Sequence, residues 1–304
     1  MRFVLGFLAR LPLPLLYGLG AFGYFVTYHV MRWQRDRAAR NLARAFPEKS
    51  DAERTAILKQ NYWNFGQVLA EALWGFAASR EEIARRVVIE NLELVEKFER
   101  RGHTVLLLTA HVCNWEWLLP AGGAHFKFPI DTVYKPVRLE AADRFLREAR
   151  SRFGGTPIPM QSFLYELMRR SVKPRVYALV ADQTPQQHME DKYWTRFLNQ
   201  DTAFYTGADK IAQFMDAPVI YVAMRRTSRG HYAVTPSVLA EPPYEPGADL
   251  PVMERFVRKL EEEIHANPAD WTWMYNKWKY PKPADADDVA RARKARRRKR
   301  VPAA

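Results

Sequence analysis

The sequence predicts an α/β fold in which a mixed, largely parallel sheet is flanked by helices, behind an N-terminal membrane-anchoring helix. Apolar runs of strand length alternate with segments of helical spacing, which is typical of α/β domains. Residues 11–31 contain no Asp, Glu, Lys or Arg. With 304 residues, 48% of them hydrophobic, the chain can bury a sizeable core. These values exclude a wholly disordered chain and a small disulfide scaffold. The single cysteine, Cys113, excludes an intrachain disulfide and a Cys-rich zinc site.

The N-terminal apolar segment predicts a membrane anchor over residues 1–31. As a helix, its 21 uncharged residues would be roughly 30 Å long, the thickness of a hydrocarbon core. Five arginines follow within residues 32–44, which favours a cytoplasmic location for what comes next. A cleaved signal peptide fits less well, because the run is long and no small-x-small cleavage site follows. A helix lying partly in one leaflet is the remaining alternative.

The basic charge is concentrated near the C-terminus. Of the net charge of +13, eight charges lie in residues 291–300, which leaves +5 for the rest. We expect residues 284–304 to form a basic disordered tail. Contact with anionic lipid would contribute roughly 1 kcal/mol per basic residue, and simple solvation is the alternative. We expect no nucleic-acid partner, because no recognition motif accompanies the tail.

Between anchor and tail, residues 32–283 are predicted to form one catalytic domain, since no linker is visible between 85 and 280. A helix is expected from Ser50-Asp51 to about Phe76, where apolar residues recur every three or four positions. Further helices are expected over 91–101, 139–153, 161–171, 207–216 and 250–266. Strands are expected over 104–109, 132–134, 176–181, 217–224 and 231–239.

The candidate chemistry follows the first of these strands, in the segment AHVCNWEW at 110–117. Sites in open α/β sheets collect at the carboxyl ends of strands. His111 and Glu116 would lie about 140° apart on a continuous helix, so they meet only if His111 is in the loop and Glu116 in the first helical turn. Glu116 would then orient His111, and His111 would take a proton from a hydroxyl. A hydrogen-bonded structural histidine is the alternative.

Other chemistries are less consistent with this segment. No serine or threonine is present as a nucleophile, which favours direct attack by a substrate hydroxyl over an acyl-enzyme. Zinc is not expected, because the sequence has no HExxH and its other histidines are scattered. Cys113 has apolar neighbours and is expected to be a buried thiol.

The HxxNWE box at 111–116 resembles the H-x4-E box of the bacterial lipid A biosynthesis acyltransferases, the late lauroyl and myristoyl transferases of the glycerolipid acyltransferase superfamily. The resemblance covers about residues 10–280. Further segments that resemble the family are ARNLARAFPEKSDAE (39–53), VYKP (133–136), Ala181-Asp182-Gln183, TAFYTGADKIAQ (202–213) and NPADWTWMYNKWK (267–279).

The resemblance implies roles for individual residues. His111 would be the general base and Glu116 its partner. Arg152 would contact phosphate or pantetheine. Beside these implied roles, we expect backbone N–H groups near Asn114, or a basic side chain, to stabilise the oxyanion. Lys135 of VYKP and Gln183 are expected to bind substrate. Asp182 would orient Arg152 or help to hold the His-Glu pair.

The resemblance also implies the reaction and its setting. It implies an O-acyltransferase, with no cofactor and no metal, on the cytoplasmic face of the bacterial inner membrane. The donor would be an acyl carrier protein thioester, with acyl-CoA as the alternative donor, and the acceptor would be a hydroxyl of a phosphorylated lipid A precursor. Anionic lipids of the inner membrane would be further partners. The alternatives are the same chemistry on another lipid, and a membrane-tethered binding protein without activity.

Overall fold

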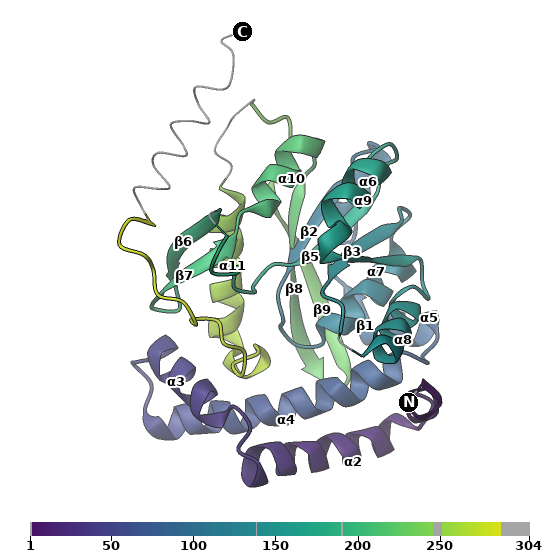
Figure 1. Ribbon diagram of the computed structural model, residues 1–304. Coiled ribbons are helices and arrows are strands. Elements are labelled where there is room, and N and C mark those ends of the chain that lie inside the picture. Colours follow the sequence, from purple (N-terminus) through teal and green to yellow (C-terminus); the bar gives the residue numbers. More distant parts are fainter. Residues whose placement is uncertain (1, 138, 190, 246–250, 287–304) are drawn as a thin grey trace.

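The computed structural model describes residues 2–137, 139–189, 191–245 and 251–286, and its centre is a seven-stranded sheet (Figure 1). The strands lie in the order β1-β9-β8-β2-β5-β3-β4, and every neighbouring pair is parallel except β8 with β9. The predicted mixed, largely parallel sheet is therefore confirmed. Its strands are β1 (Val87–Ile89), β2 (Val105–Thr109), β3 (Ile130–Tyr134), β4 (Gly155–Pro159), β5 (Val176–Val180), β8 (Val219–Ser228) and β9 (His231–Ala240).

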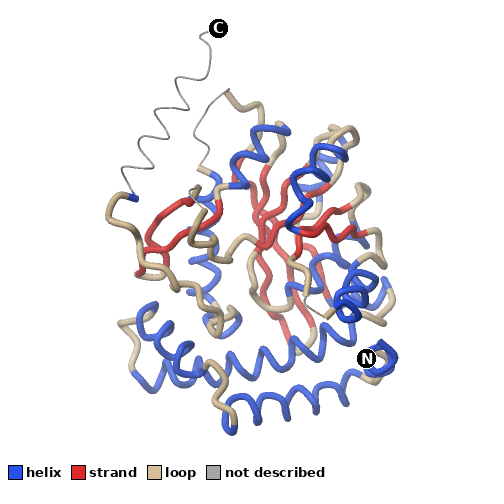
Figure 2. The backbone as a smooth tube through the Cα atoms, in the orientation of Figure 1, coloured by secondary structure: helices blue, strands red, loops and turns tan. Residues whose placement is uncertain are grey.

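Strand β2 is central, and its apolar run VLLLT is buried because helices cover the parallel sheet on both faces (Figure 2). It pairs with β5 on one side and β8 on the other. Thr109 at the end of β2 is level with Val180 at the end of β5. The residues that follow these two strands therefore meet at one edge of the sheet, which positions the site described below.

Helices and a separate hairpin surround the sheet. A hairpin of β6 (Lys192–Phe197) and β7 (Gln200–Tyr205) forms a two-stranded antiparallel sheet of its own. The helices are α3 (Arg35–Ala45), α4 (Asp51–Gly75), α5 (Arg80–Arg86), α6 (Glu93–Arg100), α7 (Leu118–His125), α8 (Glu140–Arg150), α9 (Phe163–Arg170), α10 (Gly207–Met215) and α11 (Val252–Ala266), with short 3-10 turns η2 (Trp115–Trp117), η3 (Met160–Ser162) and η4 (Pro268–Asp270).

Helix α4 begins where the sequence predicts. The Ser50 side chain accepts from the Glu53 backbone N–H, and the Glu53 carboxylate accepts from the Ser50 N–H, which closes a capping box. The 25-residue helix runs along the base of the molecule. One residue near its end, Glu71, contacts both the N-terminal segment and the loop after β2.

The N-terminal segment differs from the expected single helix over 11–31. After α1 (Arg2–Leu8), Pro12 precedes α2 (Leu13–Tyr24), which continues into a π-helical turn, η1 (Phe25–Val30). In the described part of the chain, no helix is both long and apolar enough to cross a membrane. Helix α2 packs along α4 (Figure 1) and crosses it at two glycines. A Cβ built on Gly20 would lie 2.5 Å from the Gly66 carbonyl oxygen, so neither position has room for a side chain.

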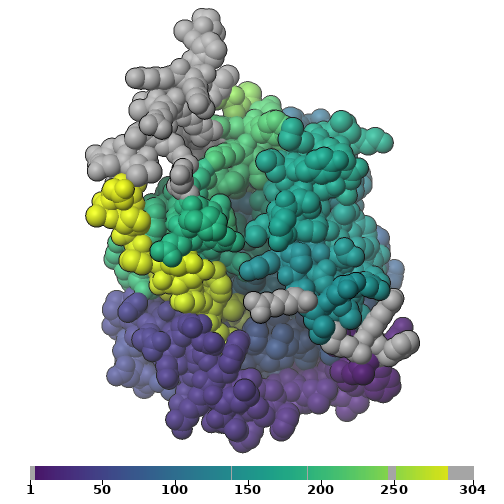
Figure 3. Space-filling model, viewed as in Figure 1, coloured from purple at the N-terminus to yellow at the C-terminus, as the bar shows by residue number. Residues whose placement is uncertain are grey.

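The segment after α11 packs against the N-terminal helices. In Figure 3 the residues after α11, coloured yellow, rest on the purple N-terminal helices. The Asn41 side-chain amide of α3 donates to the Trp273 carbonyl oxygen over 3.0 Å, which holds this contact. Most of the predicted basic tail, residues 287–304, lies outside the described residues.

Candidate active site

The ends of β2 and β5 bring His111 against Asp182. The His111 Nδ1 lies 2.7 Å from the Asp182 Oδ1, and the His111 backbone N–H donates to Oδ2 over 3.1 Å. The Trp271 indole N–H donates to the same Oδ2 over 3.0 Å. Only 4% of Asp182 is exposed, and these three donors satisfy a carboxylate that would otherwise be costly to bury.

The pair has the electrostatics of a base and its orienting carboxylate. Burial raises the pKa of Asp182, but the imidazole of His111 and the two side-chain hydrogen bonds lower it to about 2. Burial lowers the pKa of His111, but the nearby carboxylates, Asp182 above all, more than offset this effect. The pKa of His111 is therefore raised from its usual 6.5. An anionic Asp182 requires a proton on Nδ1. The neutral imidazole therefore has its lone pair on Nε2, which lies 3.5 Å from the Gln183 side-chain nitrogen.

The expected partner of His111, Glu116, forms an ion pair with Arg150 instead. The Arg150 guanidinium contacts both carboxylate oxygens, with an Nη2–Oε1 distance of 2.6 Å and an Nε–Oε2 distance of 3.2 Å. Glu116 does lie in the helical turn η2, as its spacing from His111 required. However, the hydrogen-bond position on the imidazole is taken by Asp182, from the adjacent strand. Glu116 acts on His111 only through its charge, which raises the pKa of the imidazole.

The other predicted residues fall into different places. Arg152 donates to the carbonyl oxygen of Phe76 over 2.6 Å, so it caps the end of α4, and Arg150 takes the position beside the site. Asn114 is fully buried and donates to Glu71 over 3.0 Å. Lys135 is exposed just after β3, and the exposed Gln183 lies beside His111.

The loop from 111 to 116 is tightly held by the segment after η4. Cys113 has a φ of +49°, a left-handed conformation that non-glycine residues rarely adopt. The Cys113 N–H donates to the Asp270 carbonyl oxygen over 2.9 Å, and the Thr272 hydroxyl donates to the His111 carbonyl oxygen over 3.0 Å. The sequence analysis assigns no role in the site to Trp271. The signal that could have pointed to Trp271 is Asp182, because a carboxylate that follows a buried strand needs hydrogen-bond donors.

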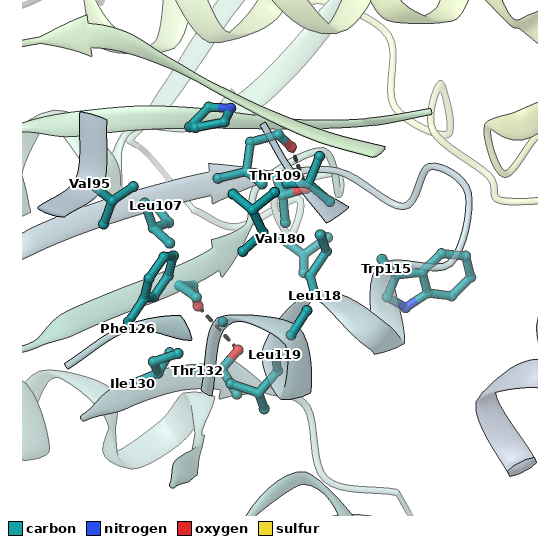
Figure 4. A pocket seen from close by; sticks show the side chains of 17 residues that line it. Val95, Leu107, Thr109, Trp115, Leu118, Leu119, Phe126, Ile130, Thr132 and Val180 are labelled. Carbon is teal, nitrogen blue, oxygen red and sulfur yellow. Dashed lines mark hydrogen bonds between the residues drawn. The ribbon is translucent and has the colours of Figure 1, made fainter. Parts of the chain in front are cut away.

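An apolar cavity begins beside His111. The Trp115 ring packs edge-on to the imidazole with 5.1 Å between ring centres, and it also lines the cavity. In Figure 4, Trp115 lies at one end, and Val95, Phe126 and Ile130 lie at the other. The cavity and its open mouth together leave about 720 Å³ free of protein atoms, part of it solvent. Its two threonine hydroxyls donate to backbone carbonyls, so the wall is apolar and suits a hydrocarbon chain.

Comparison with known proteins gives the family of this chain. The family model described as "Bacterial lipid A biosynthesis acyltransferase" matches residues 2–280. The chain belongs to this family. As a member of the lipid A biosynthesis acyltransferase family, the protein is an acyltransferase, and the resemblance carried by its motifs is confirmed.

This lipid A acyltransferase family member has low sequence identity to its named relatives, but two of the matches cover most of both chains. It is 24% identical to a lipid A biosynthesis acyltransferase of Haemophilus influenzae, over 81% of this chain and 76% of that protein. It is 22% identical to the lipid A biosynthesis lauroyltransferase of Escherichia coli, over 91% and 89%. A shorter match, 34% identical over 87 residues, joins it to the E. coli lipid A biosynthesis myristoyltransferase, over 29% of this chain and 26% of that protein.

Proposed function

We propose that the protein transfers a fatty acyl chain from an acyl carrier protein thioester to a hydroxyl of a lipid A precursor, with His111 as general base. The observation that carries this proposal is the position of the His111–Asp182 pair at one end of an apolar cavity. A chain inside that cavity would present its thioester carbonyl to Nε2. Family membership supplies the reaction class.

The proposed reaction needs one proton to move twice. His111 Nε2 takes the proton of the lipid hydroxyl as its oxygen attacks the thioester carbonyl and a new C–O bond forms. Asp182 stabilises the imidazolium, and backbone N–H groups near Asn114 stabilise the oxyanion. When the C–S bond breaks, the leaving sulfur takes the proton from His111. A positioned base of this kind contributes roughly 10²–10⁴-fold.

We propose that Glu116 and Arg150 serve the substrates. Their ion pair lies near His111, since the charge of Glu116 raises the pKa of His111. The guanidinium suits a phosphate of the acceptor lipid or of the carrier's pantetheine arm, since its planar donors match phosphate oxygens. Lys135 and Gln183 are exposed near strand ends and are proposed to contact the same polar groups.

We propose that α2 lies in the plane of the inner membrane's cytoplasmic surface. One face of α2 packs on α4, and the opposite face exposes Leu15, Leu19 and Phe22, each by more than half. Large apolar side chains continue to Trp33, and exposed arginines follow in α3. An exposed apolar helix face that is followed by arginines is suited to an anionic interface. Flotation with vesicles containing anionic lipid tests this, and Phe22→Glu should weaken the binding.

The decisive test is acyl transfer by His111→Ala with a panel of acyl carrier protein thioesters and lipid acceptors. We expect a loss of at least about 100-fold in turnover by a folded variant, whose unfolding temperature is lowered because Asp182 loses one donor. His231→Ala, at an exposed histidine on β9, is the matched control and should keep normal turnover. Normal turnover by His111→Ala would refute the mechanism. Transfer to another lipid, with none to a lipid A precursor, would refute the acceptor alone.

A further inference from the structure

A second buried carboxylate, Glu71 of α4, lies behind the loop that carries His111. None of its surface is exposed. Its Oε1 accepts from the Tyr17 hydroxyl of α2 over 2.9 Å, and its Oε2 accepts from the Asn114 side-chain amide over 3.0 Å. The Tyr232 hydroxyl of β9 also donates to Oε2, and an Arg226 nitrogen lies 3.7 Å from Oε1. One carboxylate thus joins the N-terminal helix, α4, the loop and the sheet.

Glu71 holds the loop at two points. The first is the hydrogen bond from Asn114, three positions after His111. The second is the Glu71 backbone carbonyl oxygen, which accepts from the Trp117 indole N–H over 3.1 Å. Trp117 in turn donates its backbone N–H to the Asn114 carbonyl oxygen over 3.0 Å. Both residues are buried, so their donors have no water to replace Glu71.

These contacts act on the strained part of the loop. Cys113, in its left-handed conformation, lies between His111 and Asn114. On one side its N–H is held by the Asp270 carbonyl oxygen, and on the other side Asn114 is held by Glu71. A left-handed non-glycine residue persists only when its surroundings fix it. Loss of the carboxylate would let the loop relax and would shift His111 relative to Glu116.

We infer that Glu71 is a positioning residue, which keeps the 111–116 loop in its reactive shape and ties that shape to the docking of α2 through Tyr17. This inference rests on the proposed function. Glu71 touches neither His111 nor the cavity, so it changes the rate through Asn114 rather than through contact with substrate. The exposed face of α2 and the loop therefore share one buried anchor.

The test compares Glu71→Gln with Asp131→Asn. Asp131 is equally buried and pairs with Arg170 and Arg175. It lies between the cavity-lining Ile130 and Thr132 on β3, so its side chain points to the other face. Both variants should unfold at lower temperature. Glu71→Gln should also lower kcat by about 30- to 100-fold with KM within threefold, because a small misplacement of a reacting group is costly. Asp131→Asn should keep kcat within threefold.

A milder variant carries the test if Glu71→Gln does not fold. Tyr17→Phe removes one hydroxyl and should lower kcat about fivefold, the loss expected for one hydrogen bond. Tyr244→Phe is its control, because that hydroxyl donates to the Ala217 carbonyl oxygen outside the site. In the double variant with Glu71→Gln, Tyr17→Phe should cause no further loss.

The outcomes separate this inference from the proposed function. If His111→Ala is inactive while folded Glu71→Gln, or folded Tyr17→Phe, keeps normal kcat, the positioning role is wrong and the proposed function stands. Equal kcat losses in Glu71→Gln and Asp131→Asn also overturn the positioning role. If His111→Ala keeps its activity, the proposed mechanism itself is wrong.

Discussion

His111 and Asp182 are 71 positions apart in the sequence, yet the His111 Nδ1 lies 2.7 Å from the Asp182 Oδ1. Each residue follows a central strand, and the two strands are hydrogen-bonded to each other over five residue pairs. The pair is therefore fixed by the pairing of two neighbouring strands of the sheet. Glu116, on the adjacent helical turn, is held by Arg150 instead.

The two carboxylates should differ in their effect on turnover. Asp182→Asn leaves Nδ1 without its anionic acceptor and should lower kcat by at least about 100-fold. Glu116→Gln breaks only the ion pair with Arg150 and should lower kcat by about tenfold. Steady-state kinetics of both folded variants measures the difference. A larger loss in Glu116→Gln would return Glu116 to the role of orienting partner.

The pH dependence of kcat/KM should report the His111–Asp182 pair. His111 accepts a proton only when Nε2 is unprotonated, so activity should rise with pH and level off above the pKa of His111. Burial lowers that pKa, and Asp182 raises it above 6.5 overall. Asp182→Asn removes the larger of the two causes that raise this pKa, the other being Glu116, so the rising limb should move to lower pH. A limb that stays in place would show that another group titrates.

The distal end of the cavity should set the preferred acyl chain. Phe126→Ala removes a ring at the end away from Trp115 and should shift the preference toward longer chains. Competition between carrier-protein thioesters of graded length measures this. Phe145→Ala removes a ring that packs on Phe76 outside the cavity, and it should leave the preference unchanged. The same preference in both variants would place the chain elsewhere.

The contact between α2 and α4 should tolerate no side chain. Gly20→Ala forces a methyl group against the Gly66 backbone and should destabilise the protein by about 1–3 kcal/mol. Gly23→Ala, also in α2, meets nothing within 4 Å and should be neutral or stabilising by up to about 1 kcal/mol. Thermal or urea unfolding distinguishes them. Equal stabilities would mean that the two helices are not in this contact in solution.

Lys277 should make stability depend on pH in the alkaline range. Its amine is 1% exposed and donates to the Ala203 carbonyl oxygen over 3.1 Å, and burial lowers its pKa from 10.5 to about 7. Between these values the unfolded chain binds a proton that the folded chain lacks, so the free energy of unfolding should rise with pH. Below pH 7 this contribution is constant and unfavourable.

Replacement of the amine should remove that slope. In Lys277→Met, the slope of the free energy of unfolding against pH should fall by up to about 1.4 kcal/mol per pH unit between pH 7 and 10.5. Urea unfolding at several pH values measures it. Lys279→Met, at an exposed neighbour, is the control and should behave as the parent. An unchanged slope in Lys277→Met would mean that the amine is protonated in the fold.

The sequence predicted the elements that are strongly patterned. The continuous apolar run of β2 and the capping box of α4 fix those elements locally. Strand β4 escaped prediction because it contains two prolines, which only an edge strand accommodates. The short strand β1 and the polar β6–β7 hairpin lack a clear alternation.

The site was predicted less completely than the fold, because its partners come from distant segments. His111 follows from its place after a buried strand. Its pairing with Asp182 depends on β5 lying next to β2, and strand order is not written in local pattern. Arg150 is the last residue of α8, and Arg152 lies just beyond the helix. For this reason Arg150 contacts Glu116, whereas Arg152 contacts the end of α4.

The segment around Trp271 also makes activity a test of chain integrity. A chain cut before Asp270 still contains β2, β5, His111 and Asp182. It lacks the indole N–H on Asp182, the carbonyl oxygen that holds Cys113 and the hydroxyl that holds the His111 carbonyl. A chain truncated before Asp270 would therefore keep His111 but lose three of the contacts that hold His111, Cys113 and Asp182 in place.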